Sequence, residues 1–331
     1  MHEVDVLIVG AGPVGLYGAY YAGFRGLTVA LMDSLPEPGG QVSALYPEKN
    51  IYDIAGLPGV RGQTLIDNLV AQAAPFSPHY LLDQQAETAE HTPDGRITVT
   101  SAQGVVVRAR AVIVTGGVGS FSPRPLPCGR DFEGRGLCYF VPRLEELRGL
   151  DTIVVGGGDS AVDWALALID VARSVTLVHR RQAFRAHEHS VSRLRSSTVR
   201  LVLDAELTEL LGEQRVSAAR VAVKGSHEPL TLDTQAVVAA LGFKADLGPL
   251  ETWGLTLDRR RVAVDTAMRT GVPGIFAAGD IATYPGKVKL IAVGFGEVAL
   301  AVNNAAVSLQ PEVGLEPGHS SDAAPVPAAA L

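Results

Sequence analysis

Val4 to Gly15 has the sequence VDVLIVGAGPVG and decides the fold near the start of the chain. A short apolar, β-branched run ends at a glycine-rich loop, and the small and aromatic residues from Gly15 to Gly23 predict a helix. Leu27 to Met32 predicts a second strand, which ends at Asp33. A strand, a GxGxxG loop, a helix and a strand ending in an acid form the nucleotide-binding βαβ unit, in which the acid accepts hydrogen bonds from ribose hydroxyls.

The same pattern occurs again in the middle of the chain. Thr152 to Val155 predicts a strand, a GGGDSA loop begins at Gly156, Ala161 to Ala172 predicts a helix, and Ser174 to Val178 predicts the next strand. Counted from the first glycine, the position that holds Asp33 in the first unit is a histidine here, and two arginines follow it. Guanidinium groups bind phosphate oxygens with charge-assisted hydrogen bonds, so this cluster suits a 2′-phosphate. The predicted NADPH contacts are Gly156, Gly158, Asp159, Ser160, His179, Arg180, Arg181 and Arg185.

Two glycine loops with opposite charges at the ribose-reading position indicate two different dinucleotides, one of them FAD or NAD and the other NADPH. Hydride transfer is the simplest reason to bring two such cofactors together. The predicted fold class is α/β, with two Rossmann-like dinucleotide-binding domains, the second inserted in the first. The expected boundaries are 1–117 with 243–322 for the flavin domain, 118–242 for the NADPH domain, and 323–331 for a disordered tail.

Further elements support this division. A hairpin is predicted from 97–100 and 105–108 around Gln103-Gly104, and 111–117 and 236–242 are apolar strands that end in glycine at the two crossings between domains. The flavin domain then resumes with a strand over 274–280 and a helix over 294–308.

Composition narrows the class of protein. The chain has 331 residues, 47% hydrophobic and 19% charged, which is typical of a globular enzyme with well-buried sheets. A net charge of −7 argues against a nucleic-acid partner. We see no signal peptide and no run of about 18 apolar residues, so we expect no membrane segment and a cytoplasmic location. Cys128 and Cys138 are too far apart for a CxxC motif, no metal site is expected, and both are interpreted as unreactive thiols.

Nearly all of residues 3–322 resembles the ferredoxin (or flavodoxin)–NADP⁺ reductases of the thioredoxin-reductase-like type. The matching segments are Gly39-Gly40-Gln41, LYPEK over 45–49, GGGDSAVDW over 156–164, His179-Arg180-Arg181, FRAHEHSV over 184–191, Gly279-Asp280, and KVKLIAVGFGEVALAVNN over 287–304. The resemblance implies FAD and NADPH as cofactors, a fold of two domains and a homodimer.

The resemblance also implies the flavin contacts. Tyr46 matches the aromatic residue stacked on one face of the flavin ring, and His319 would cover the other face, with Ser320 or Ser321 at the ring edge. No residue is an obligatory catalytic acid or base, because the cofactors carry the chemistry. The expected FAD contacts are Gly10, Gly12, Gly15, Asp33, Gln41, Tyr46, Asp53, Ala86, Phe121, Gly279, Asp280, His319, Ser320 and Ser321.

Thioredoxin reductases themselves carry a redox-active CxxC shortly before the second glycine loop, and here that stretch is Tyr139-Phe140-Val141-Pro142. Without a dithiol, electrons cannot leave through a protein disulfide. The first hypothesis is therefore an enzyme in which NADPH passes hydride to flavin N5 and electrons leave singly to ferredoxin or flavodoxin. Acidic carriers would dock on a basic surface, for which the candidates are Arg124, Arg130, Arg135, Arg143 and Arg148.

Two alternatives remain open at the level of sequence. One is an NADPH-dependent flavoprotein that reduces a quinone, oxygen or a small disulfide, although the missing CxxC disfavours disulfides. The other is a non-enzymatic sensor that binds both nucleotides without passing electrons between them.

Overall fold

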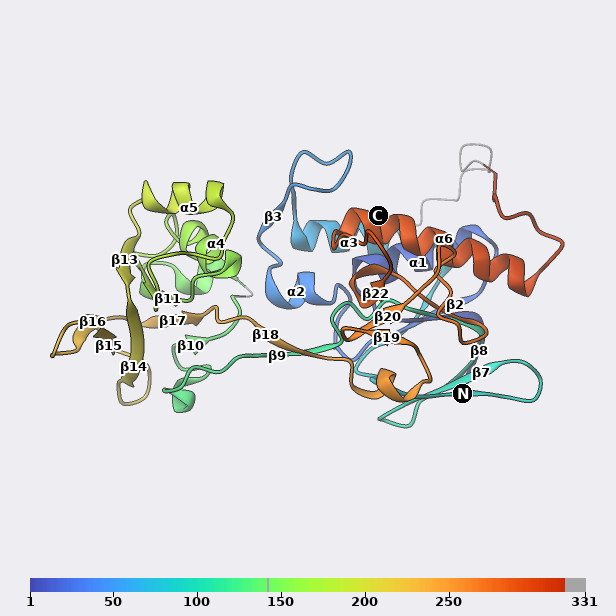
Figure 1. Cartoon of the computed structure of the whole chain (residues 1–331), viewed down its shortest axis with the longest axis horizontal. Helices are drawn as coiled ribbons and strands as arrows, with labels where there is room; N and C mark the ends of the chain where they lie inside the picture. Colours follow the sequence, from blue (N-terminus) through green and yellow to red (C-terminus); the bar gives the residue numbers. More distant parts are fainter. Residues whose placement is uncertain (142, 319–331) are drawn as a thin grey trace. The chain divides into compact units, whose positions relative to one another are not determined.

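The computed structural model describes residues 1–141 and 143–318, and the chain folds into two compact units. The first unit comprises Met1–Ser120 and the described part of Ala245–Leu331, and the second unit, Phe121–Lys244, is inserted between these segments (Figure 1). At the two crossings, β9 (Ser120–Pro123) and β18 (Phe243–Asp246) pair in a two-stranded sheet. The boundaries expected from the sequence, at residues 117–118 and 242–243, lie next to these strands.

The first unit is built on a seven-stranded sheet. Its order is β5 (His79–Leu81), β2 (Val29–Met32), β1 (His2–Val9), β8 (Val106–Val114), β7 (Ile97–Ser101) and β6 (Ala86–His91), with β21 (Ile275–Ala277) also paired to β8. β5, β2, β1, β8 and β21 are parallel to their neighbours, whereas β6, β7 and the first half of β8 form an antiparallel meander. In this register Val9 lies between Met32 and Val114, so the residues that follow these three strands meet at one edge of the sheet.

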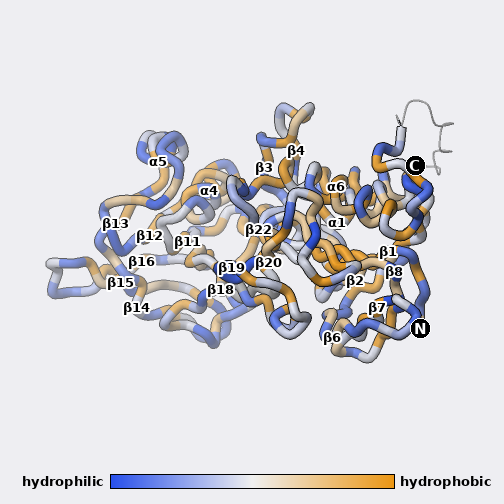
Figure 2. The backbone as a smooth tube through the Cα atoms, turned by 45° about the vertical axis from the view of Figure 1, so that its right-hand side comes forward, coloured by the Kyte–Doolittle hydropathy of each residue, from blue (hydrophilic) through white to orange (hydrophobic). Residues whose placement is uncertain are grey.

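The two faces of this sheet are covered differently. Val6 and Ile8 of β1 pack against α1 (Pro13–Phe24), α3 (Gly62–Ala73) and α6 (Ile291–Leu309). Leu7 and Val9 face the opposite core, which includes the short helix η4 (Gly248–Thr252) and the sheet of β19 (Leu257–Asp258), β20 (Arg261–Ala263) and β22 (Ala282–Thr283). Figure 2 shows hydrophobic residues concentrated along these strands and helices. The remaining elements of the unit are α2 (Gln41–Leu45), β3 (Asn50–Ile51), β4 (Val60–Arg61), η1 (Ala74–Phe76) and η5 (Gly279–Ile281).

Helix α6 is long and apolar enough to cross a membrane, judged by length and composition alone, and it is the one such helix among the described residues. From the sequence we expected no membrane segment, because no unbroken run of about 18 apolar residues is present. That criterion did not detect α6. One face of α6 is buried in the first unit through Val298, Ala301 and Val302, while Leu300 on another face is 46% exposed. A core helix that packs on α1 satisfies the same criteria, so length and composition do not assign α6 to a membrane.

The second unit repeats the parallel βαβ plan. Its sheet has the order β10 (Leu137–Cys138), β17 (Ala236–Ala239), β11 (Asp151–Val155), β12 (Ser174–His179) and β13 (Arg200–Leu203), all parallel. One core cluster contains residues of α4 (Asp159–Ala167) and α5 (Glu188–Arg195), and the other contains the antiparallel sheet of β14 (Ala205–Leu211), β15 (Ala218–Val223) and β16 (Leu230–Asp233). The short helices η2 (Arg130–Phe132) and η3 (Leu144–Leu147) complete the unit.

Two predicted elements differ from the structure. The separate strands expected over 105–108 and 111–117 are one continuous strand, β8. One edge of β8 pairs with β1 from Val107 to Val114, while its other edge pairs first with β7 and then with β21. The helix expected to reach residue 172 ends at Ala167, after which the amide of Ile169 bonds to the carbonyl of Leu166 and the chain turns. Both differences reflect pairing and turn geometry that the local pattern does not encode.

Candidate dinucleotide-binding sites

The first glycine loop, which joins β1 to α1, can be built only from glycine at two positions. Gly10 has φ +114°, and a Cβ there would lie 2.6 Å from the carbonyl oxygen of Thr115. A Cβ on Gly15 would lie 1.9 Å from the carbonyl oxygen of Gly10. At Gly12, in contrast, no described heavy atom lies within 4 Å of the added Cβ, and Gly12 is the N-cap of α1. The loop is therefore tight on the inside and open where a pyrophosphate would approach the helix N-terminus.

The second glycine loop, between β11 and α4, has the same construction. Gly156 has φ +148°, and its Cβ would lie 2.4 Å from the carbonyl oxygen of Ala240. Gly158 is the N-cap of α4, with no described heavy atom within 4 Å of its added Cβ. Ala161 replaces the third glycine, and its methyl group fits against Gly156. Ala240 and Thr115 are equivalent, because each directly follows the strand that pairs with the first strand of its βαβ unit, β17 beside β11 and β8 beside β1.

Asp33 lies beside the first loop, and its carboxylate is already engaged by the backbone. Oδ2 accepts a hydrogen bond from the amide of Ala11 at 2.6 Å, and Oδ1 accepts one from the amide of Leu35 at 2.9 Å. Burial raises the pKa of Asp33, and these backbone donors oppose that shift. Each carboxylate oxygen has a further lone pair, so the group can hold the loop and still accept from a ribose hydroxyl. The residues present thus fit the adenosine half of a dinucleotide.

His179 has a different role from the arginines that follow it. It is 9% exposed, and its Nε2 lies 3.1 Å from the carbonyl oxygen of Ala183. The ring stacks on Phe184 with centroids 5.2 Å apart, and a Cβ on Gly157 would lie 2.1 Å from His179 Cε1. The imidazole therefore packs against the second glycine loop. The requirement for glycine at position 157 follows from this packing.

Three arginines lie exposed on the loop after β12, namely Arg180, Arg181 and Arg185. In the described part of the chain none of them forms an ion pair. The amide of Arg185 donates to the carbonyl of Gly157 at 2.8 Å, and the amide of His187 donates to Asp159 Oδ1 at 2.8 Å. These bonds hold the arginine loop against the glycine loop. Ser160 is exposed next to Asp159 at the start of α4. Unpaired guanidinium groups beside an open helix N-terminus fit a phosphorylated ribose.

The Gly39-Gly40-Gln41 segment packs on the first glycine loop. The amide of Gly39 donates to the carbonyl of Ala11 at 2.8 Å, and a Cβ on Gly40 would lie 3.1 Å from Gly12 Cα. Gln41 begins α2, and its side-chain nitrogen Nε2 would lie 2.9 Å from a Cβ on Gly117. Residues from three distant segments therefore line one edge of the sheet.

Tyr46 directly follows α2, and the electrostatics show which carboxylates are near it. Burial raises the pKa of Tyr46 to about 12, and the negative charges of Asp280 and Asp53 add to the shift. Asp280 lies in η5 after β21, while Asp53 is exposed after β3. The structure thus brings together Tyr46, Asp53 and Asp280, all of them expected flavin contacts.

A buried ion pair supports the turn that contains Asp280, and sequence reasoning missed it. Glu297 of α6 accepts hydrogen bonds from the amide of Gly279 at 2.8 Å and from Tyr284 Oη at 2.5 Å, and it pairs with Lys287. The side chains of Lys287 and Glu297 are 2% and 4% exposed. Burial and the Glu297 carboxylate raise the pKa of Tyr284 to about 12. The available signal was a lone carboxylate inside an otherwise apolar helix.

Other expected contacts are less well defined. Ala86 is buried at the start of β6. Only the backbone of Phe121 is described, in β9. His319, Ser320 and Ser321 lie outside the described residues, as does Pro142 in the stretch that replaces the dithiol.

The thiols are poor candidates for chemistry. Cys128 and Cys138 are free and partly buried. Burial raises the pKa of Cys138 to about 12, with a further contribution from Glu146, and burial and Glu209 raise the pKa of Cys128. The thiolate is the reactive form, so the raised pKa values disfavour reactions of both thiols.

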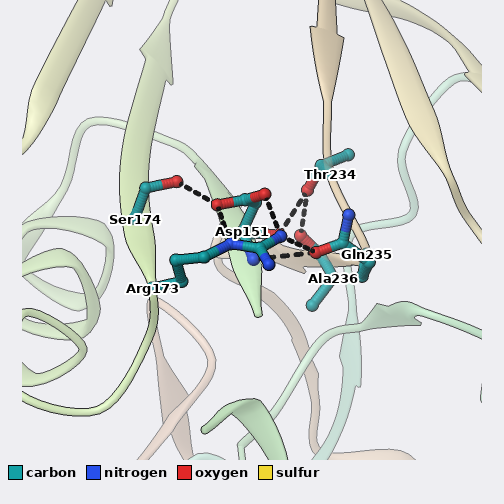
Figure 3. Close-up of polar contacts among 6 residues, drawn as sticks. All are labelled: Asp151, Arg173, Ser174, Thr234, Gln235 and Ala236. Atoms are coloured by element: carbon teal, nitrogen blue, oxygen red, sulfur yellow. Dashed lines mark hydrogen bonds and ion pairs between the residues drawn. The ribbon is translucent and has the colours of Figure 1, made fainter. Parts of the chain in front are cut away.

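A polar cluster at the other edge of the second sheet is structural (Figure 3). Asp151 begins β11, and its carboxylate binds Arg173 and accepts from Ser174 Oγ at 2.6 Å, while Gln235 accepts from the amide of Asp151 at 3.0 Å. The first unit has the counterpart, in which Asp5 accepts from Thr28 at 2.7 Å and from Arg110 at 3.0 Å. In both units the acid and hydroxyl residues are 23 positions apart. In the second unit the cluster joins the amino ends of neighbouring strands, and in both units the cluster lies away from the glycine loop.

The basic surface predicted for a carrier is weaker than its sequence suggests. Arg143 pairs with Glu146 at 2.8 Å, Arg148 pairs with Glu145, and Arg135 donates to the carbonyl of Asp131. Of the five candidates, Arg124, Arg130 and Arg135 are exposed without a carboxylate partner among the described residues, and the Arg135 guanidinium is engaged by a backbone carbonyl.

Two matched glycine loops, each in its own parallel α/β unit, define an oxidoreductase that binds two dinucleotides. A family model described as pyridine nucleotide-disulphide oxidoreductase matches residues 4–305, and the chain belongs to this family and, within it, to the ferredoxin–NADP reductases. It is 60% identical to the ferredoxin–NADP reductase of Frankia alni over 96% of this chain and 98% of that protein. It is 49% identical to the Thermus thermophilus protein of the same name, over 97% and 98%.

Solved structures confirm the fold. The thioredoxin reductase of T. acidophilum matches with a TM-score of 0.78 at 23% identity, covering 93% of this chain and 99% of that one. The thioredoxin reductase of Lactococcus lactis matches with a TM-score of 0.76, also at 23% identity, over 92% and 99%. The predicted fold class and family resemblance are therefore confirmed, and membership of the family implies FAD and NADP(H) as cofactors.

Proposed function

We propose that this protein is an FAD-dependent ferredoxin–NADP⁺ reductase. The observation that carries the proposal is the pair of glycine loops, which share one construction but have Asp33 beside the first and unpaired Arg180 and Arg181 beside the second. The first unit would hold FAD and the second NADPH. Relatives that match nearly the whole chain at 49–61% identity bear the same name.

The overall reaction balances without a protein thiol. One NADPH and two molecules of oxidised ferredoxin give NADP⁺, one proton and two molecules of reduced ferredoxin. Bound FAD would supply the chemistry that accepts one hydride from NADPH and releases its two electrons one at a time. The protein's own residues bind and orient: the N-termini of α1 and α4 hold pyrophosphates, Asp33 holds a ribose, and Arg180 and Arg181 select the 2′-phosphate.

Residues around Tyr46 would position the flavin ring. The phenol is protonated at neutral pH even at the ordinary pKa of tyrosine, about 10. Burial and the charges of Asp280 and Asp53 raise this pKa further. An uncharged aromatic face suits stacking on a flavin. The Glu297–Lys287 pair holds the Gly279–Asp280 turn in place behind this group. The roles expected for His319, Ser320 and Ser321 are part of the same proposal.

The function is tested with purified FAD-loaded protein under anaerobic conditions. We expect NADPH to bleach the flavin absorbance and to support rapid reduction of ferredoxin or flavodoxin. Quinones, small disulfides and, in a separate aerobic assay, oxygen should be reduced with a much lower kcat/KM. A higher kcat/KM for one of these acceptors would mean that it, and not ferredoxin or flavodoxin, is the electron acceptor. If NADPH fails to bleach the flavin, the remaining hypothesis is a non-enzymatic sensor.

We also propose a homodimer and a cytoplasmic location. Val288, Leu290 and Leu300, on or next to α6, are 53%, 39% and 46% exposed, an apolar set that self-association would cover. Free thiols that are not paired in a disulfide are compatible with a reducing compartment. Light scattering of the purified protein would show the mass of two chains, and the mass of one chain would contradict the dimer.

A further inference from the structure

The hairpin between β19 and β20 has an unusual turn. Leu257 pairs with Val262 and Asp258 with Arg261, so the connection consists of Arg259 and Arg260 alone. Their φ angles are +47° and +64°. A two-residue hairpin with both φ values positive is the type I′ geometry, for which Asn-Gly is the favoured pair. Side chains with a Cβ are sterically disfavoured there, so the two arginines occupy a turn that other residues would form more easily.

The charge at this tip is exposed. Arg259 and Arg260 are both exposed, and Arg261 lies opposite Asp258 in the ladder. Arg260 has one distant carboxylate partner, Asp246, at 3.7 Å, with both side chains more than 60% exposed. Exposed pairs of this kind bind weakly and leave the cation available to another anion. Two accessible guanidinium groups therefore project from a strained turn, and strain of this kind accumulates where function requires it.

The placement of the tip connects it to the candidate flavin site within the same unit. β20 runs parallel to β22, with Val262 next to Ala282, and β22 directly follows the Gly279–Asp280 turn. The tip precedes β20 as that turn precedes β22, so both lie at the same end of this small sheet (Figure 1). Asp280 is in turn close to Tyr46.

We propose that Arg259 and Arg260 form a docking tip for the acidic surface of the one-electron carrier. This inference rests on the proposed function and names the part of the first unit that the carrier contacts. A protein with acidic side chains around its redox centre would satisfy both guanidinium groups and would dock at the end of the sheet that contains the flavin-binding turn. Electrostatic docking of this kind raises the association rate and is weakened by salt.

The test exploits the turn geometry. The variant Arg259→Asn/Arg260→Gly removes both charges and installs the pair that a type I′ turn favours, so its thermal stability should be equal to or higher than that of the parent. We expect its KM for an acidic ferredoxin to rise about fivefold or more at low ionic strength, with a shallower dependence on salt. NADPH oxidation with a neutral quinone should not change.

Two controls distinguish the effect of the charges at Arg259 and Arg260 from the effect of the protein's overall charge. Arg259→Lys/Arg260→Lys keeps the charge and should hold the ferredoxin KM within about twofold of the parent. Arg215→Asn/Lys224→Asn removes two exposed cations from the second unit and should leave the KM unchanged. If the parent reduces ferredoxin while the Asn-Gly variant keeps its KM and salt dependence, or if the second-unit variant raises the KM equally, the docking tip is wrong. If the parent does not reduce ferredoxin at all, the proposed function itself has failed.

Discussion

Single residues distinguish the two nucleotide sites, although their backbones are alike. Asp33 uses its carboxylate to brace the first loop, and His179 uses its ring to brace the second. Both residues occupy the same offset in the sequence, so the equivalent position supports the loop in each unit. We propose that Arg180 and Arg181, which are exposed and unpaired in the described part of the chain, recognise the 2′-phosphate.

This assignment predicts a selective loss of NADPH use. Changing Arg180→Ala/Arg181→Ala should raise the KM for NADPH about 10- to 100-fold, because two charge-assisted contacts to phosphate are removed. The KM for NADH should change little, since NADH lacks the phosphate. Steady-state kinetics with a quinone acceptor measures both values, and Arg215→Ala/Lys224→Ala is the matched control. Equal increases for the two coenzymes would mean that these arginines do not read the phosphate.

The residue scale also shows the limits of sequence reasoning. The glycine loops were predictable because the steric demand at Gly10, Gly15 and Gly156 is local and leaves a motif. The Glu297–Lys287 pair was not, because it depends on α6 packing behind the Gly279–Asp280 turn. The Arg259-Arg260 turn was missed although it is local, because its residues are not those that type I′ turns favour.

At the scale of elements, strand pairing separates two kinds of contact. The polar clusters around Asp5 and Asp151 lie away from the glycine loops, which follow the carboxyl ends of β1 and β11. The hydrogen bonds from Arg173 lower the pKa of Asp151, followed in effect by the bond from Ser174. A lowered carboxyl pKa stabilises the folded state above the pKa of the unfolded chain, about 3.9, and this contribution is lost as the pH falls through the folded-state value.

The polar cluster around Asp151 therefore predicts a pH-dependent difference in stability between the parent protein and a variant that lacks the carboxylate. Asp151→Asn should lower the melting temperature by about 3 °C or more at pH 7, and the difference should shrink towards about pH 3, where the parent carboxyl group is protonated. Circular dichroism melts over this pH range measure the effect. Glu145→Gln, which breaks the exposed pair with Arg148, is the control and should change little. A constant difference at all pH values would show that the charge of Asp151 does not contribute.

Element boundaries show why part of the fold could not be anticipated. β1, β2, β11 and β12 were predictable from apolar runs between glycine and polar residues. The three-stranded sheet of β14, β15 and β16 was not foreseen, although the alternation in β14 is typical of a half-buried strand. The pairing of its strands is set by tertiary contacts. β8 was divided in two for a similar reason, since its halves have different partners.

At the scale of the whole molecule, the chain contains the same nucleotide-binding unit twice, and we propose that the first copy binds FAD and the second NADPH. The family to which the chain belongs is described as pyridine nucleotide-disulphide oxidoreductase. In this chain Tyr139, Phe140 and Val141 occupy the expected position of the dithiol, and both cysteines have raised pKa values. Electrons from NADPH should therefore leave from the flavin directly to an external carrier.

The most direct measurement of this claim is the rate of NADPH-dependent ferredoxin reduction by a protein without cysteine. In the variant Cys128→Ser/Cys138→Ser we expect the ferredoxin kcat to stay within about twofold of the parent, because no thiol lies on the electron path. The rate of flavin bleaching by NADPH, measured in the same preparation, shows whether the nucleotide sites are intact. A variant that is still bleached normally by NADPH but has lost ferredoxin reduction would contradict the account.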